Sequence, residues 1–156
     1  MGVNMKIYIF DLDNTTIDSR HRQLYFLNKE LDLEYWEQNS TRENIFKDEL
    51  LFLALFMQWL ISQQFTVWVL TAREISDYDI EFLKHHKLMP DRIISRAKGD
   101  KRPDHIFKKE RMEEIINRSR LMITSEIVFF DDKERNRNAL SELGINCCDE
   151  WGFRNG

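Results

Sequence analysis

Asp11 and Asp13 lie one residue apart at the end of a short apolar run, and Thr15 follows two positions later. Side chains on a strand alternate with a period of two, so the two carboxylates converge where the strand opens into a loop. Two acids held this close repel each other unless a cation lies between them. Mg²⁺ prefers oxygen ligands and commonly binds together with a phosphate. The pair therefore predicts a magnesium site beside a phosphorylated substrate.

Two further apolar runs end in polar side chains. Thr71 follows residues 67–70, and Asp131 and Asp132 follow residues 127–130. Open α/β sheets place ligand sites at the carboxyl ends of their strands, so we expect these groups to meet the first pair of acids there. A basic, lysine-rich stretch lies between the last two runs.

Each motif also has a purely structural interpretation. Asp after a strand is common in an Asx turn, residues 71–74 fit a helix capping box, and an acid after a strand often caps the next helix. An EF-hand calcium loop is excluded, because it would need Gly at Thr16 and Glu at Arg22.

The order Asp-x-Asp-x-Thr, hydrophobic-Thr, Lys, Asp-Asp resembles the four-motif signature of the haloacid dehalogenase (HAD) superfamily of phosphotransferases. Residues 19–22, 35–36, 71–74 and 96–108 resemble, more narrowly, the phosphatase domain of phage-type polynucleotide kinase/3′-phosphatases. The likeness extends from about Lys6 to Phe153. One departure is Lys133, which stands where the family's Asp-Asp-Arg has its arginine.

The resemblance implies roles for the motif residues. Asp11 would attack phosphorus and form an aspartyl-phosphate. Asp13 would protonate the leaving oxygen and later deprotonate the attacking water, with its main-chain carbonyl facing the metal. Thr71 would hydrogen-bond the phosphoryl group, assisted by the amides of Ala72 and Arg73 at a helix start.

The resemblance also implies a charge-compensating lysine before the last motif. Lys108 fits this place best, with Lys101 and Lys109 as alternatives. Asp131 and Asp132 would join Asp11 and Asp13 as Mg²⁺ ligands.

Further side chains are candidates for contact with the substrate. Arg73 offers a charged fork for a phosphate. Asp104 belongs to a loop that either touches the substrate or is shaped by its own residues. The predicted substrate-binding residues are Arg73, Arg96, Arg102, His21 and Arg22.

Length and composition favour a folded single domain over residues 1–156, since 42% of the 156 residues are hydrophobic. The formal net charge is −4, yet residues 84–120 hold twelve Lys and Arg against six Asp and Glu. Such a basic band suits a substrate with a polyanionic body, although a solvated helix face is the alternative.

Targeting signals are not evident. The N-terminus has no signal-like run, no stretch is long enough to span a membrane, and the adjacent Cys147 and Cys148 favour a reducing compartment. We therefore expect a cytoplasmic protein without a membrane partner. Its oligomeric state is not indicated.

Hydrophobic periodicity and turn residues predict the order of elements. Strands are expected at 6–10, 66–70, 92–94, 127–130 and 145–147, and helices at 43–62, 78–86, 108–117 and 133–143. This alternation predicts an α/β fold with a doubly wound, mostly parallel, Rossmann-like sheet. Residues 14–42 interrupt it and are expected to form a small helical flap, which leaves the site open.

The leading hypothesis is a Mg²⁺-dependent phosphomonoesterase that removes 3′-phosphates from nucleic acid ends. The alternatives are a phosphatase of free nucleotides and, less favoured, a phospho-accepting signalling domain, in which the paired acids would come early and the single acceptor later. No Gly-x-x-x-x-Gly-Lys-Ser/Thr loop is present, so the chain has no recognisable kinase half.

Overall fold

The computed structural model describes residues 6–154. Within them, five parallel strands form one sheet in the order β5-β4-β1-β6-β7, with β1 at the centre. The strands are β1 (Ile7–Phe10), β4 (Thr66–Leu70), β5 (Arg92–Ile94), β6 (Ile127–Phe130) and β7 (Asn146–Cys148). The doubly wound parallel sheet predicted from the sequence is thus confirmed.

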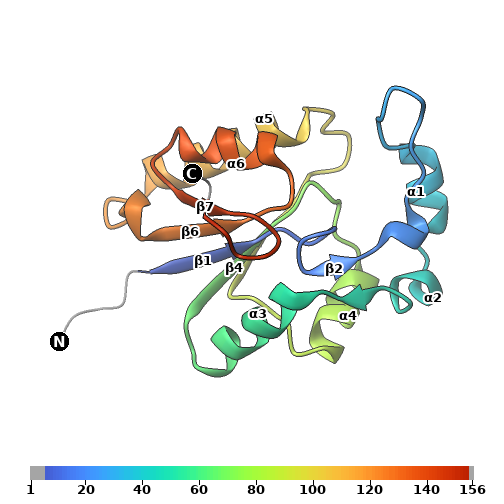
Figure 1. The fold of residues 1–156 in the computed structure, drawn as a ribbon, viewed down its shortest axis with the longest axis horizontal. Helices are drawn as coiled ribbons and strands as arrows, with labels where there is room; N and C mark the ends of the chain where they lie inside the picture. Colours follow the sequence, from blue (N-terminus) through green and yellow to red (C-terminus); the bar gives the residue numbers. More distant parts are fainter. Residues whose placement is uncertain (1–5, 155–156) are drawn as a thin grey trace.

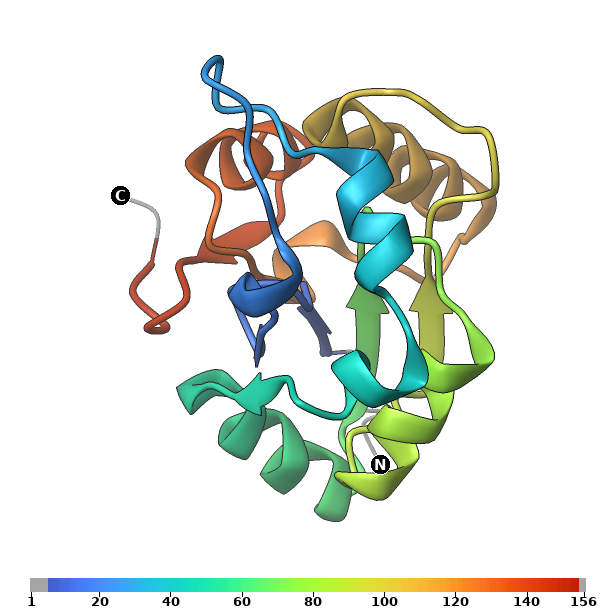
Figure 2. The same ribbon diagram turned by 90° about the vertical axis from the view of Figure 1, so that its right-hand side faces the viewer.

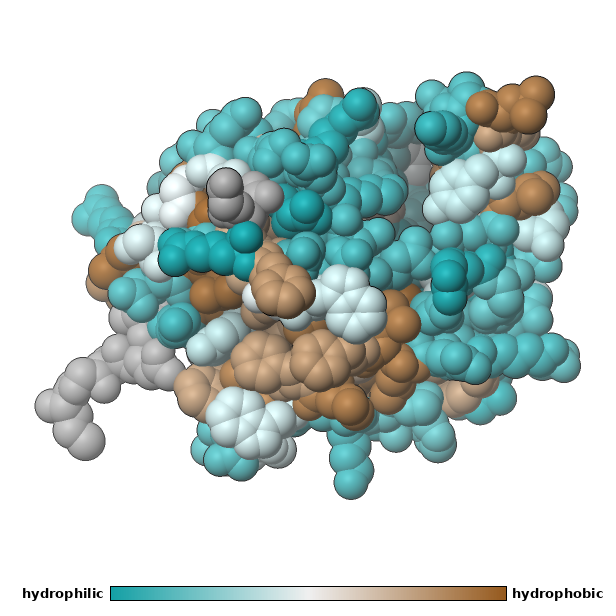
Figure 3. Space-filling view, viewed as in Figure 1, coloured by the Kyte–Doolittle hydropathy of each residue, from teal (hydrophilic) through white to brown (hydrophobic). Residues whose placement is uncertain are grey.

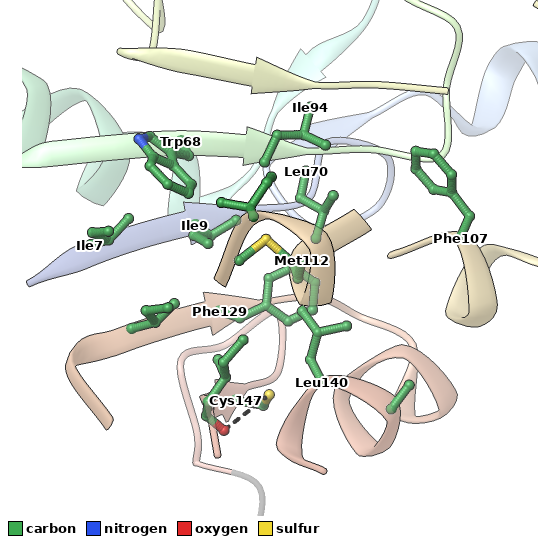
Figure 4. Packing of buried hydrophobic residues seen from close by; sticks show 14 residues of the cluster. Ile7, Ile9, Trp68, Leu70, Ile94, Phe107, Met112, Phe129, Leu140 and Cys147 are labelled. Carbon is green, nitrogen blue, oxygen red and sulfur yellow. Dashed lines mark hydrogen bonds between the residues drawn. The ribbon is translucent and has the colours of Figure 1, made fainter. Parts of the chain in front are cut away.

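Helices cover both faces of the sheet (Figure 1). Helices α5 (Asp104–Arg118) and α6 (Glu134–Ser141) lie on one face, and α3 (Phe52–Ser62) and α4 (Asp77–His85) lie on the other. Because strand side chains alternate, Ile7 and Ile9 pack toward the first pair of helices, while Tyr8 and Phe10 pack toward the second. In Figure 4, Met112 of α5 packs over Leu70 and Phe129 of the sheet.

The segment from 42 to 62 corrects the sequence prediction of one helix over 43–62. Helix α2 (Arg42–Ile45) ends after one turn, β3 (Glu49–Leu50) follows, and α3 begins only at Phe52. Strand β3 pairs antiparallel with β2 (Ile17–Asp18). The apolar period continues through this break, because Ile45, Leu53 and Met57 all enter the same core, so periodicity alone did not reveal it.

The flap expected over residues 14–42 is only partly helical. It contains β2, a 3₁₀ turn (Arg20–Arg22), a hairpin-like loop closed by a bridge between Tyr25 and Leu31, and helix α1 (Leu33–Asn39). Figure 1 shows α1 on the right, the side toward which β1 runs, and in Figure 2, viewed from that side, the loop and α1 lie in front of the sheet. The flap thus stands beside the carboxyl ends of the strands.

The remaining bounds differ from the prediction by a few residues. Helix α5 begins at Asp104 rather than at 108, and α6 ends at Ser141, three residues before Gly144. Gly144 has a φ of +88°, and a Cβ there would lie 2.8 Å from the Thr124 hydroxyl, so glycine is required on both counts.

The surface contains a hydrophobic region over α3 (Figure 3). Phe52, Leu55 and Trp59 on the outer side of that helix are each more than half exposed. Among the described helices, none combines the length and the apolar character that crossing a bilayer requires.

Candidate active site

Three carboxylates lie together where β1 and β6 end. Asp11 follows β1, and Asp131 and Asp132 follow β6, the neighbouring strand. Each offers an oxygen within 4.8 Å of the others. Asp11 and Asp131 are buried, and Asp132 is partly exposed. The structure therefore brings together three of the four predicted metal ligands.

Lys108 places its ammonium between two of these acids. Its Nζ donates to Asp11 Oδ1 at 2.9 Å and to Asp131 Oδ2 at 2.6 Å, and the residue is 2% exposed. Burial lowers the pKa of Lys108, but the two carboxylates outweigh it and raise the pKa above its usual value. Lys109 instead pairs with Glu142 on the outside of the helix, so of these two lysines it is Lys108 that contacts the acids.

The charge of the cluster suits a divalent cation. Burial and the neighbouring Asp131 raise the pKa of Asp11 well above its ordinary value, and the same causes raise the pKa of Asp132 to about 6. Three ionised carboxylates beside one ammonium leave two negative charges, and buried charges need compensation. A doubly charged ion with oxygen ligands matches both the charge and the donor set.

Hydroxyl and amide groups fix the orientation of the acids. Thr15 donates its hydroxyl hydrogen to Asp11 Oδ2 at 2.8 Å and accepts the main-chain N–H of Asp132 at 2.9 Å. Asn136, in the first turn of α6, donates to Asp131 Oδ2 at 3.0 Å. Sequence reasoning did not assign Asn136 to the site, although its place five residues after Asp131 was a usable signal.

Asp13 is held apart from the three-acid cluster by Arg73. The guanidinium donates to both oxygens of Asp13, and its Nη1 donates to Asp79 Oδ1 at 2.6 Å. Burial raises the pKa of Asp13, but Arg73 and the Ser19 hydroxyl outweigh it and hold the pKa below its usual value. The Asp13 side chain therefore faces an arginine, and only its main chain is left for the metal role predicted from the resemblance.

Thr71 is fully buried at the end of β4 and lines the same cavity as Asp11. The predicted helix start at this residue is wrong, because α4 begins at Asp77 and its capping box joins Ser76 and Asp79. The Thr71 hydroxyl instead accepts the N–H of Arg73 at 3.1 Å, two residues on, which makes a local turn. The amides of Ala72 and Arg73 therefore do not open a helix.

The loop before α5 is shaped by its own charges. Arg96 donates to the carbonyl of Arg102 at 2.7 Å and to the Asp104 carboxylate at 2.9 Å, and Arg102 forms an ion pair with Asp100. Lys133 also reaches Asp104, at 3.2 Å. Both arginines line the cavity, but their guanidinium groups are engaged within the loop. Lys101 lines it without an ion pair among the described residues.

Two predicted substrate-binding residues lie elsewhere. Arg22 is 1% exposed and pairs with Asp48 through Nε at 3.0 Å and Nη2 at 2.6 Å. His21 Nε2 lies 2.6 Å from the same carboxylate. Neither residue lines the cavity, so the structure does not bring these two together with the other predicted substrate-binding residues. Both contact a buried aspartate, 27 positions from His21 and 26 from Arg22, which the sequence did not identify as a partner.

A cavity of about 670 Å³ connects the acids to the flap. Its floor holds Asp11, Asp13, Thr71 and Lys108, and its apolar wall comes from the flap. That wall consists of Tyr25, Leu31, Leu33 and Trp36. Cavities of this size take small molecules, and a few convergent polar groups with an apolar wall are typical of such sites.

The family described as "Bacteriophage T5 5′-deoxynucleotidase" matches residues 3–151. Comparison with curated protein sequences gave no match.

Several solved structures share the fold. A haloacid dehalogenase-like hydrolase from Streptococcus pneumoniae superimposes with a TM-score of 0.68 at 12% identity, covering 96% of this chain and 87% of that one. A HAD-hydrolase from Bacillus subtilis bound to magnesium has a TM-score of 0.62 at 13% identity, covering 92% and 87%. A chain of the Pnkp1/Rnl/Hen1 RNA repair complex has a TM-score of 0.60 at 23% identity, covering 92% of this chain and 42% of that chain.

Proposed function

This chain belongs to the bacteriophage T5 5′-deoxynucleotidase family, and we propose that it removes the 5′-phosphate from deoxynucleoside monophosphates. It is a phosphatase of the HAD type, as its motifs predicted. The proposed substrate was the alternative in the sequence analysis, after nucleic acid 3′ ends. The family match over residues 3–151 moves the free nucleotide to first place.

The observation that carries the proposal is the division of the cavity into two chemically different parts. The acids, Thr71 and Lys108 form a charged floor, and the flap provides an apolar wall with Tyr25 and Trp36. A nucleoside monophosphate has the same two parts, a phosphate dianion and an aromatic base. A volume of about 670 Å³ is enough for one such molecule.

The proposed reaction has two steps. A carboxylate oxygen of Asp11 bonds to phosphorus while the bond to the leaving 5′-oxygen of the deoxyribose breaks, and that oxygen takes a proton from Asp13, whose pKa rises when the phosphate dianion is bound beside it. A water oxygen then attacks the phosphorus of the aspartyl-phosphate and gives its proton to Asp13, which releases phosphate and restores Asp11. Lys108 and Thr71 offset and hydrogen-bond the charge on the phosphoryl oxygens.

Mg²⁺ fits the donor set. Asp11, Asp131 and Asp132 would hold it through carboxylate oxygens, with the main-chain carbonyl of Asp13 as a further ligand. When bound, it would neutralise the two excess negative charges of the cluster and attract the phosphate.

A 3′-phosphatase of polynucleotides is the second candidate. It is supported by Lys101, which borders the cavity without an ion pair among the described residues, and by the shared fold with the Pnkp1 complex. The predicted basic band supports it less than the sequence suggested. Arg96, Arg102 and Lys109 are already paired with acids of the chain, which leaves fewer charges for a nucleic acid backbone.

The test is a substrate panel measured with wild-type protein, Asp11→Asn and the control Asp18→Asn. Asp18 is an acid of similar position in the chain, but it forms a surface pair with Arg20 and does not line the cavity. We expect many turnovers of phosphate release from deoxynucleoside 5′-monophosphates, loss of this activity in Asp11→Asn, and full activity in Asp18→Asn.

The same panel separates the alternatives. Chelation should abolish the activity, and added Mg²⁺ should restore it. Preference for a 3′-phosphorylated oligonucleotide, weakened by salt, would establish the second candidate instead. Phosphate retained once per chain, without turnover, would favour a phospho-accepting domain. Activity that survived Asp11→Asn would contradict the mechanism.

A further inference from the structure

Three polar side chains connect the flap to Asp13. Ser19 donates its hydroxyl hydrogen to Asp13 Oδ1 at 2.5 Å. Gln23 Nε2 donates to Ser19 Oγ at 2.9 Å, and the Tyr25 hydroxyl donates to Gln23 Oε1 at 2.8 Å. Every donor in this row points toward the carboxylate.

The direction of the row follows from the chemistry of its members. Ser19 is fully buried and has one hydroxyl hydrogen, so once this hydrogen is given to Asp13 its oxygen must accept from Gln23. The amide of Gln23 is further oriented by Asn14, with which it exchanges two longer bonds of 3.4 Å. Hydrogen bonds in such a chain polarise one another, so a change at Tyr25 is felt at Asp13.

Tyr25 belongs to the flap and also to the cavity wall. The bridge between Tyr25 and Leu31 holds Tyr25 in the hairpin-like loop. Tyr25 is about half exposed, and it lines the same cavity as Asp13. A substrate under the flap therefore lies beside Tyr25, at one end of this row of hydrogen bonds. At the other end, Ser19 bonds to Asp13, the acid that serves the leaving oxygen.

We propose that Ser19, Gln23 and Tyr25 form a positioning chain through which the flap orients the Asp13 carboxyl toward the leaving oxygen. The inference rests on the proposed role of Asp13. Arg73 holds the same carboxylate from another side, so breaking the chain misplaces the acid without removing it. The expected loss is therefore about fivefold to tenfold in kcat, small beside the roughly 10²–10⁴-fold that general acid catalysis contributes as a whole.

The experiment uses Tyr25→Phe, which removes only the hydroxyl, Gln23→Leu, and the double variant. Tyr35→Phe is the matched control, because Tyr35 is also a flap tyrosine, does not line the cavity, and has no hydroxyl hydrogen bond among residues 6–154. Each protein is assayed on a deoxynucleoside 5′-monophosphate and on p-nitrophenyl phosphate. Nitrophenolate leaves with little need for protonation, so the placement of Asp13 matters less for the first step with this substrate. That step is followed as the pre-steady-state release of nitrophenolate, because the second step uses Asp13 with both substrates.

The chain predicts a specific pattern. Tyr25→Phe and Gln23→Leu lower kcat on the nucleotide about fivefold to tenfold with KM unchanged, and they leave the pre-steady-state release of nitrophenolate within about twofold of wild type. The double variant is no slower than Gln23→Leu, because Tyr25 acts through Gln23. Tyr35→Phe behaves as wild type on both substrates.

Three results would overturn the proposed positioning chain. They are a kcat for Tyr25→Phe equal to that of Tyr35→Phe, a rise in KM alone, and losses that add in the double variant. Failure of the proposed substrate is a separate outcome. If the wild-type protein does not hydrolyse nucleotides, the same variants are assayed on glycerol 2-phosphate, whose leaving alkoxide also needs a proton. An enzyme active on aryl phosphates alone would count against the positioning chain too.

Discussion

Replacing Arg22 with Met should destabilise the protein by about 3–5 kcal/mol, the usual cost of removing one partner from a buried ion pair. The side chains of Arg22 and Asp48 are each 1% exposed, and two hydrogen bonds of 3.0 and 2.6 Å join them. Methionine keeps most of the length of the stem but leaves the Asp48 carboxylate with the His21 ring, at 2.6 Å, as its remaining side-chain partner among the described residues. The substitution also removes a cation from the face of Trp36, 4.3 Å from the ring centre.

The size of the effect can be read from a thermal melt. For a domain of this length, 1 kcal/mol corresponds to a shift of roughly 2–4 °C, so the melting temperature should fall by roughly 6–20 °C. Circular dichroism at neutral pH is sufficient to measure this. Arg20→Met is the control, because Arg20 forms an exposed pair with Asp18 and such pairs contribute little to stability.

A second substitution tests the physical reason. Arg22→Met combined with Asp48→Leu removes both charges, so it should recover at least half of the lost stability, since an apolar pair of similar volume can replace a buried ion pair. Melting of Arg22→Met within 2 °C of wild type, or a double variant no more stable than the single one, would refute the role assigned to charge burial.

Three further predictions concern the site and its supports. Burial and Asp131 raise the folded-state pKa of Asp132 to about 6. The metal-free protein should therefore lose stability relative to Asp132→Asn as the pH rises from about 4 to about 6. A relative gain in stability over that range would contradict the raised pKa. Ser76→Ala should cost about 1 kcal/mol in a urea titration, since Ser76 caps α4, and no change would show that the cap is dispensable. Lys101→Gln should raise KM roughly threefold to tenfold at low salt without changing kcat. Lys98 does not line the cavity, so Lys98→Gln should leave KM unchanged. Equal effects of the two substitutions would exclude a local contact between Lys101 and the substrate.

The sequence alone was enough to predict the sheet and the meeting of the acids. Buried parallel strands read as continuous apolar runs, and polar residues that follow such runs must gather at one edge of the sheet. Asp11 and Asp131 are 120 positions apart, yet the strands before them are neighbours. The motif order also predicted a phosphatase, which the family match confirms.

Other features depended on partners that are distant in the chain. The apolar period continues unbroken through residues 46–51, because periodicity reports burial and not the strand pair with residues 17–18 that interrupts the helix. Arg22 is a buried ion-pair partner because of Asp48, and Arg73 faces Asp13 across 60 positions.

The choice among three lysines shows the same limit. Lys101, Lys108 and Lys109 have the same chemistry in sequence, and only the helical phase of α5 against the sheet turns Lys108 inward to Asp11 and Asp131 while Lys109 turns outward. Residue types and spacing determined which groups were available for chemistry. Tertiary packing decided which of them are paired with one another and which line the cavity, because the energy of a buried charge depends on neighbours that the chain brings together only when it folds.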